Sequence, residues 1–150
     1  MDSLLLVTHS VVRYFVLIAL LAVIGRSFMG WTGKKEYAAM DGKLGLWLMI
    51  ATHTQFLIGL ILYFTSPRVI FSAESMKDST DRYWLVEHIS MMIIAVALIT
   101  VARVTSRKMT EAMAKHKRMF LFNTIALIVI LTAIGLSDRG FFSLGSISSR

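Results

Sequence analysis

The chain has 150 residues, 56% of them hydrophobic, with one proline and no cysteine. Its mean hydropathy is +0.68, yet it carries 16 Lys and Arg against 9 Asp and Glu, a formal net charge of +7. Long uncharged apolar stretches at this composition exclude an ordinary soluble domain. The lack of cysteine excludes disulfides, thiolate-ligated iron–sulfur clusters and covalently attached c-type haem.

Four apolar stretches of 18 to 22 residues follow one another along the chain. At about 1.5 Å of rise per residue, each covers the roughly 30 Å hydrocarbon layer, and only helices satisfy every backbone group there. Short loops favour antiparallel packing of sequential helices. We therefore expect one all-α domain over residues 1–150, a transmembrane four-helix bundle with up-down-up-down topology. The expected spans are residues 4–24, 44–65, 85–102 and 119–136.

Local signals support these boundaries. We expect the first span to be retained and not cleaved as a signal peptide, because Asp2 stands where a basic n-region is required and no small-residue cleavage site follows. Ser66-Pro67 is expected to end the second span, and Asp81 is expected to cap the third.

The basic residues are unevenly distributed between the loops. Ten lie in the loops 25–43 and 103–118, whereas five lie in the N-terminus, the loop 66–83 and the tail, where Arg139 and Arg150 are counted. The positive-inside rule then places both basic loops in the cytoplasm and both termini outside. The positive charge is explained by membrane orientation, and no nucleic-acid partner is expected.

Two histidines inside the spans share one depth. His9 lies 17 residues from Arg26, and His88 lies 15 residues from Arg103. These separations are about 25 and 22 Å at helical rise, so both histidines lie near the outer end of the bundle. They belong to diagonal helices, where two imidazoles can approach a planar haem from opposite faces. A copper or zinc site, or separate hydrogen bonds at the membrane edge, is also compatible with the spacing.

Apolar residues one or two turns deeper on the same faces are expected to form the walls of such a site. On the first span they are Val12, Val16 and Leu20, and on the third they are Met91, Met92, Ala95 and Ile99. Walls of this kind exclude water from a haem and influence its reduction potential.

Two charged residues accompany the histidine pair. Arg13 lies one helical turn from His9, and Glu87 precedes His88. One interpretation is an ion pair between the first and third spans; the other is that Arg13 neutralises a haem propionate or a quinone oxygen. Further candidates for binding a propionate at this end are Arg68, Lys77, Arg82 and Tyr83.

The two remaining histidines lie at other depths. His53 lies near the bilayer centre, about 10 Å from the level of His9, and is therefore a poor third ligand. It remains a candidate for a second metal site, a proton carrier or a quinone pocket with Gln55, or it forms hydrogen bonds with a neighbouring helix. His116 lies in the basic run 115–118, which is interpreted as a membrane anchor.

A set of short motifs extends over nearly the whole chain. In chain order they are His9-Ser10 with Arg13-Tyr14, Gly30-Trp31, Asp41 with Lys43-Leu44, Thr52-His53 with Gln55, Gly59-Leu60 with Leu62-Tyr63-Phe64, Ser66-Pro67, Phe71, Met76-Lys77-Asp78, Glu87-His88 with Met91-Met92, Arg103, and Lys115-His116-Lys117. In these motifs the chain resembles the small four-helix bacterial membrane proteins commonly labelled "cytochrome B". The resemblance implies a non-covalent b-type haem, electron transfer and a bacterial inner membrane location, with His9 and His88 as axial ligands. No second level pair of histidines accompanies them, which disfavours a two-haem electron wire.

The leading hypothesis is a b-type cytochrome-like subunit with one bis-histidine haem near the outer face. Six-coordinate iron leaves no open position, which favours transfer of single electrons over oxygen chemistry. The expected partners are a quinone or a redox protein, within a larger complex or a homo-oligomer. One alternative is a copper-handling membrane protein that uses His9, His88, Met91 and Met92. Another is a non-catalytic accessory subunit of a larger membrane complex.

Overall fold

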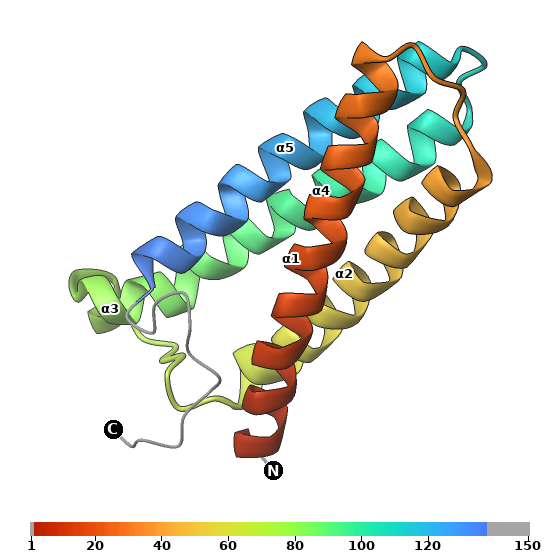
Figure 1. Ribbon diagram of the computed structural model, residues 1–150. Helices are drawn as coiled ribbons and strands as arrows, with labels where there is room; N and C mark the ends of the chain where they lie inside the picture. Colours follow the sequence, from red (N-terminus) through yellow and green to blue (C-terminus); the bar gives the residue numbers. More distant parts are fainter. Residues whose placement is uncertain (1, 138–150) are drawn as a thin grey trace.

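A computed structural model describes residues 2–137 as four long helices joined by short connections (Figure 1). The long helices are α1 (Asp2–Thr32), α2 (Ala39–Thr65), α4 (His88–Arg107) and α5 (Ala112–Leu136). Between α2 and α4 lie a 3-10 turn (Ala73–Lys77), the short helix α3 (Ser79–Arg82) and a π-helical turn (Tyr83–Glu87). Arg139 and Arg150, two of the cations used for the orientation argument, lie outside the described residues.

The four long helices form the predicted antiparallel bundle. α1 packs against α2 and α5, and α4 packs against the same two helices, so α1 and α4 are diagonal partners. All four are long and apolar enough to cross a membrane, over Ser3–Thr32, Ala39–Thr65, Ser79–Arg107 and Ala112–Leu136. Large apolar side chains such as Phe15, Ile18 and Leu57 are exposed on the outer surface, as lipid-facing residues are. The chain is therefore a multi-pass membrane protein.

The helices extend beyond the predicted spans, mainly at the end with the two basic loops. α1 continues eight residues past the expected boundary at residue 24, and α5 begins seven residues before residue 119. The apolar runs mark the hydrocarbon layer, whereas the helical hydrogen bonds continue into the polar interface. Ser66 ends α2 as predicted, and its N–H donates to Leu62 O at 2.7 Å. The Asp81 cap was wrong, because Asp78 accepts from Thr80 N–H and Asp81 N–H.

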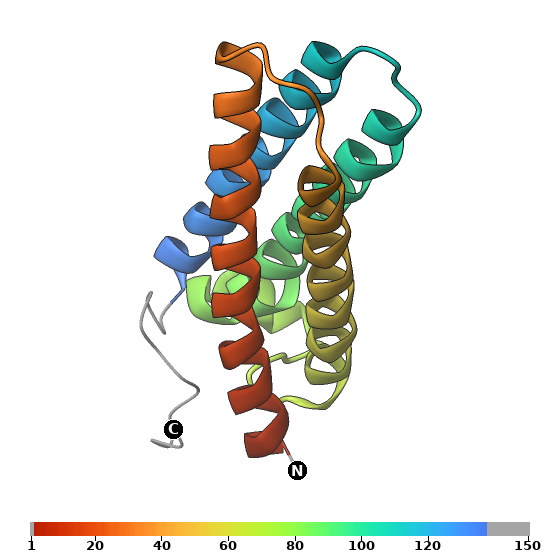
Figure 2. The same cartoon turned by 45° about the vertical axis from the view of Figure 1, so that its right-hand side comes forward.

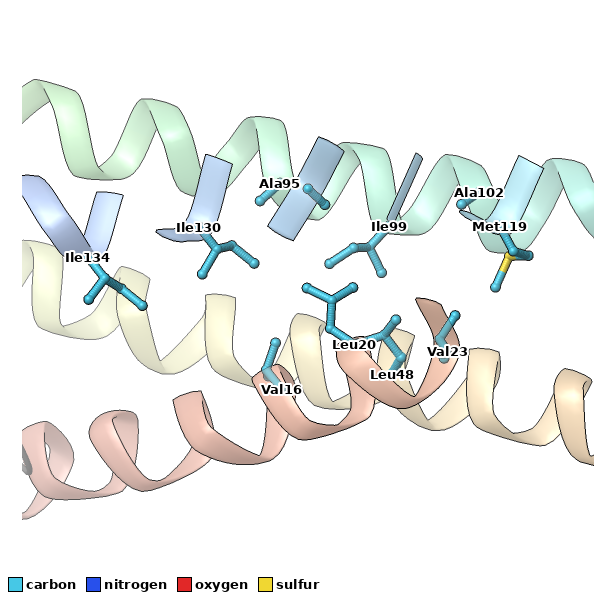
Figure 3. Close-up of a cluster of buried hydrophobic side chains, with 11 residues drawn as sticks. Val16, Leu20, Val23, Leu48, Ala95, Ile99, Ala102, Met119, Ile130 and Ile134 are labelled. Carbon is cyan, nitrogen blue, oxygen red and sulfur yellow. The ribbon is translucent and has the colours of Figure 1, made fainter. Parts of the chain in front are cut away.

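The bundle is closed toward its basic end and open toward the other. Figures 1 and 2 show the α1–α2 pair separating from the α4–α5 pair toward the N-terminus of α1. In the closed part, apolar side chains from all four helices interdigitate (Figure 3). This core comprises Val16, Leu20, Val23, Leu48, Ala95, Ile99, Ala102, Met119, Ala126, Ile130 and Ile134. Small residues at 102 and 126, both fully buried, allow close helix approach.

Candidate functional site

The open end of the bundle contains a cavity between the two helix pairs. It encloses about 1310 Å³ of empty space, its open mouth included. His9 of α1 and His88 at the start of α4 both line it, so the structure brings these two residues to one space from diagonal helices. The walls are mainly apolar, with Leu17, Phe56, Leu60, Ile89 and Met92 among the lining residues.

The cavity extends less far toward the basic end of the bundle than the sequence predicted. Of the expected wall residues, Val16, Met92 and Ala95 line it. Leu20 and Ile99 lie instead in the closed core, where each is at most 1% exposed. The core therefore forms the floor of the cavity, about two to three helical turns from the histidines along α1 and α4.

The π-helical turn before α4 determines the environment of His88. The turn brings the His88 N–H to Tyr83 O, five residues earlier, and places the Tyr83 hydroxyl 3.3 Å from His88 Nδ1. The same hydroxyl donates to the carbonyl oxygen of Ala133 on α5. A carbonyl oxygen only accepts, so the single hydroxyl proton is used there and His88 Nδ1–H donates to Tyr83. His88 Nε2 consequently carries the lone pair that binds a metal.

Three contacts surround this turn, one with α2, one with Arg68 just after α2, and one between Trp84 and His88. The Tyr63 hydroxyl of α2 donates to Leu85 O at 2.7 Å. The Trp84 ring lies 5.3 Å from the His88 ring, and the Arg68 guanidinium lies 5.6 Å from the centre of the Trp84 ring. These contacts restrict the orientation of the His88 imidazole. The sequence analysis named Tyr83 only as a candidate for binding a propionate and assigned Trp84 no role at this site, because a π turn leaves no simple sequence pattern.

His9 lies against α2 at a glycine. A Cβ atom at Gly59 would lie 3.2 Å from His9 Nε2. One turn earlier on α2, Gln55 Nε2 donates to His9 O at 2.8 Å and ties the two helices together. Gln55 Oε1 is buried and lines the cavity, with no hydrogen-bond partner among the residues that the structure describes. The glycine and the glutamine thus set the position of His9.

The charged residues divide into two groups. Arg13 and Arg68 line the cavity and supply its positive charge. Glu87 pairs with Arg82 (Nε to Oε1, 2.9 Å) in place of the expected partner Arg13, because the π turn directs its carboxylate back along the chain. Neither Arg82 nor Glu87 lines the cavity.

His53 lies apart from this site. It is exposed on α2, and its Nε2 lies 2.8 Å from the Thr100 hydroxyl of α4. The interpretation as a hydrogen bond to a neighbouring helix is therefore confirmed. Gln55 lines the cavity and His53 does not, so the two residues do not form a common pocket.

A second polar cluster occupies the basic end. His116 of α5 is 1% exposed and packs inside the bundle, whereas the membrane-anchor role of the basic run 115–118 stays a prediction. Its Nε2 lies 3.2 Å from Glu36 O, its ring lies 5.1 Å from the Tyr37 ring, and Gly30 of α1 lies against it. Burial raises the pKa of the Tyr37 hydroxyl, and the Asp41 carboxylate raises it further. This cluster was missed because its parts are distant in sequence.

No family is identified for this chain. Comparisons with models of protein families, with curated proteins and with solved structures find no match. Within residues 2–137, no group of three or more His, Asp or Glu side chains is arranged to hold a metal ion. Among these residue types, a metal centre at the open end would therefore draw on His9 and His88 alone within the described residues.

Proposed function

We propose that the protein is a b-type cytochrome-like subunit that binds one haem between His9 and His88. The observation that carries this proposal is the shared cavity, which both histidines line from diagonal helices. Haem iron brings four nitrogen ligands of its own and requires only two from the protein. A pair of histidines with no third His, Asp or Glu grouped beside it in residues 2–137 fits that requirement.

The residues around the pair fit a large planar ring. The lack of a side chain at Gly59 lets the His9 ring lie close against α2, and Ala95 presents only a methyl group to the cavity. The hydrogen bond from His88 Nδ1 to Tyr83 favours the tautomer that a metal ligand needs. Arg13 and Arg68 are placed to neutralise the two propionates of a haem.

Haem in such a site supplies a one-electron redox couple. The chain's own contribution is to position both imidazoles, to exclude water with apolar walls and to stabilise carboxylates with two arginines. Two histidine ligands complete the coordination of the iron, which favours electron transfer over oxygen chemistry. We further propose that the cavity faces outward in a bacterial inner membrane. The haem would exchange electrons with a quinol or a redox partner protein. The protein would act within a larger complex or a homo-oligomer.

A reduced-minus-oxidised spectrum of protein expressed with ample haem tests the proposal. We expect b-type haem bands in the wild type and their loss in His9→Ala and in His88→Ala. His53→Ala is the matched control, since His53 lies outside the cavity, and it should retain the bands. A wild type without haem, or retention by both ligand variants, would overturn the assignment.

One observation favours a second candidate. Met92 lines the cavity together with both histidines, and two imidazoles with a thioether suit copper. Met91 is not among the lining residues, so the predicted pair of methionines contributes one side chain. Copper retained by a colourless protein on metal analysis would favour copper handling over electron transfer through haem.

A further inference from the structure

A second, smaller cavity lies at the basic end of the bundle, opposite the open end where His9 and His88 line the first cavity. It encloses about 410 Å³ of empty space, its mouth included, between the end of α1, the connection 33–38 and the start of α2. Its polar lining residues are Arg26, Lys35, Glu36, Asp41 and His116. Exposed Met29 forms part of the wall and extends the cavity toward the apolar outer surface.

His116 lines this cavity and carries a buried acceptor nitrogen that lies beside Gly30, another lining residue. Its Nε2 lies 3.2 Å from Glu36 O, and a carbonyl oxygen only accepts, so Nε2 carries the hydrogen. Nδ1 is then the lone-pair nitrogen. It is buried and has no hydrogen-bond partner within the described part of the chain. A buried acceptor of this kind is costly, so a ligand in the cavity is expected to donate a hydrogen bond to it.

The charged residues around the cavity indicate that the ligand also carries an anionic group. Asp41 is already occupied, since Oδ1 accepts from Arg26 Nε at 2.8 Å and Oδ2 accepts from Ala38 N–H at 2.8 Å. Lys35 lies exposed at the mouth and Arg26 has further guanidinium N–H groups, so both remain able to bind an anion. The exposed Glu36 carboxylate adds a negative charge and an acceptor to the same lining, so the cavity suits a bipolar ligand with an anionic group and an N–H or O–H donor.

We propose that this cavity binds the headgroup of a phospholipid that carries a hydrogen-bond donor, such as phosphoethanolamine or phosphoglycerol. Lys35 and Arg26 bind the phosphodiester, the headgroup donor reaches His116 Nδ1, and an acyl chain follows the surface at Met29. The place fits this ligand, because the helices that frame the cavity end at the membrane interface and basic pockets there bind lipid headgroups. A choline headgroup has the same phosphodiester without a donor and is excluded.

Native mass spectrometry of detergent-purified protein, mixed with phosphatidylethanolamine, phosphatidylglycerol or phosphatidylcholine, tests this inference. We expect one retained lipid, with ethanolamine and glycerol headgroups preferred over choline. Equal retention of all three lipids would overturn the proposal. Retention of phosphatidylglycerol alone would overturn it too, because general attraction of an anionic lipid to basic loops would then be sufficient. Displacement by free phosphoethanolamine would assign the cavity to a soluble ester and overturn the lipid assignment.

Two neighbouring lysines provide a matched pair of variants. Lys35→Gln removes a charge that lines the cavity, whereas Lys34→Gln removes the same charge from the adjacent residue, which does not line it. Loss of one charge-assisted hydrogen bond should lower lipid retention about tenfold in Lys35→Gln, and Lys34→Gln should match the wild type. Equal losses in both variants would contradict the site. In His116→Phe, if it folds, the preference for ethanolamine over choline should disappear; the lysine pair decides the question if it does not fold.

Discussion

The two ends of the bundle each hold a histidine beside a cavity, with one ring nitrogen bonded to the protein. At the open end, His88 Nδ1 is bonded to Tyr83; at the closed end, His116 Nε2 is bonded to Glu36 O. The open cavity has about 1310 Å³ of empty space and apolar walls, and the closed one has about 410 Å³ and charged walls. The same side chain thus lies beside two cavities that differ in size and in lining.

The contrast predicts that the lining, more than the histidine, determines what each of the two sites binds. Each imidazole obtains one partner from nearby backbone or hydroxyl groups, as a buried polar group must. The distance between the helix pairs then sets the size of the remaining space. Glycines allow close helix contact at two of these histidines, since Gly30 of α1 lies against His116 of α5 and Gly59 of α2 lies against His9 of α1.

The largest stability effect is expected at the closed end. In Gly30→Ala the new methyl group would overlap the His116 ring, which is packed between α1 and Tyr37. Overpacking of this kind costs about 1–3 kcal/mol, and we expect the upper part of that range because the ring cannot move. Thermal unfolding in detergent measures the change.

Gly25→Ala on the same helix is the control, because nothing lies within 4 Å of its Cβ position. It should leave the midpoint unchanged or raise it slightly. Equal destabilisation of both variants would mean that helix flexibility, rather than contact with His116, is what Gly30 provides.

At the open end, the corresponding glycine-to-alanine change at Gly59 should affect haem binding more than folding. In Gly59→Ala the Cβ atom would lie 3.2 Å from His9 Nε2 and must displace the ring. We expect haem affinity to fall about tenfold, the equivalent of roughly 1.4 kcal/mol, with a nearly unchanged unfolding midpoint. Haem titration followed by absorbance measures this effect. Gly42→Ala, also in α2 and without neighbours within 4 Å, should bind as the wild type does.

A smaller effect is expected for the ion pair beside the π turn. The Arg82 and Glu87 side chains are 42% and 36% exposed, so solvent screens their attraction. Arg82→Gln should lower the free energy of unfolding by less than about 1 kcal/mol, and the difference should shrink at high salt. Lys77→Gln, which removes a longer and more exposed pair with Glu74, should have no measurable effect. A large loss in Arg82→Gln would indicate that the pair holds the π turn itself.

The spans, and the depth of each residue in the membrane, were predictable from the sequence. Hydropathy and the helical rise predicted four spans, their antiparallel order and the diagonal placement of the helices that carry His9 and His88. These quantities depend on local composition and on a fixed rise per residue. The cavity that both histidines line lies where the counting placed them, near the N-terminal end of α1.

The direction in which side chains point around each helix axis was harder to predict from the sequence. The π turn at residues 83–87 rotates the following residues and directs Glu87 to Arg82. The burial of His116 depends on a glycine 86 positions earlier, on another helix. Neither effect leaves a periodic signal in the chain, because both arise from tertiary contacts.

The smallest expected effect concerns Tyr37, which packs on His116 at the closed end. Its pKa is raised above the ordinary value of 10.0 by burial and by the Asp41 carboxylate, with Arg103 acting in the opposite direction. The folded state therefore holds the phenol proton more tightly than the unfolded state does. The resulting stabilisation is complete below pH 10 and is lost as the pH rises from there through the folded-state pKa.

Tyr37→Phe removes this titration and little else, because the hydroxyl lies a long 3.5 Å from its acceptor, Asp41 O. Wild type and variant should unfold at similar denaturant concentrations at pH 8. Above pH 10 the wild type should lose stability faster than the variant, and lysine titration cancels because both chains share every lysine. Parallel pH profiles would mean that the hydroxyl ionises as easily in the folded state as in the unfolded one, and that the closed end is wetter than its packing indicates.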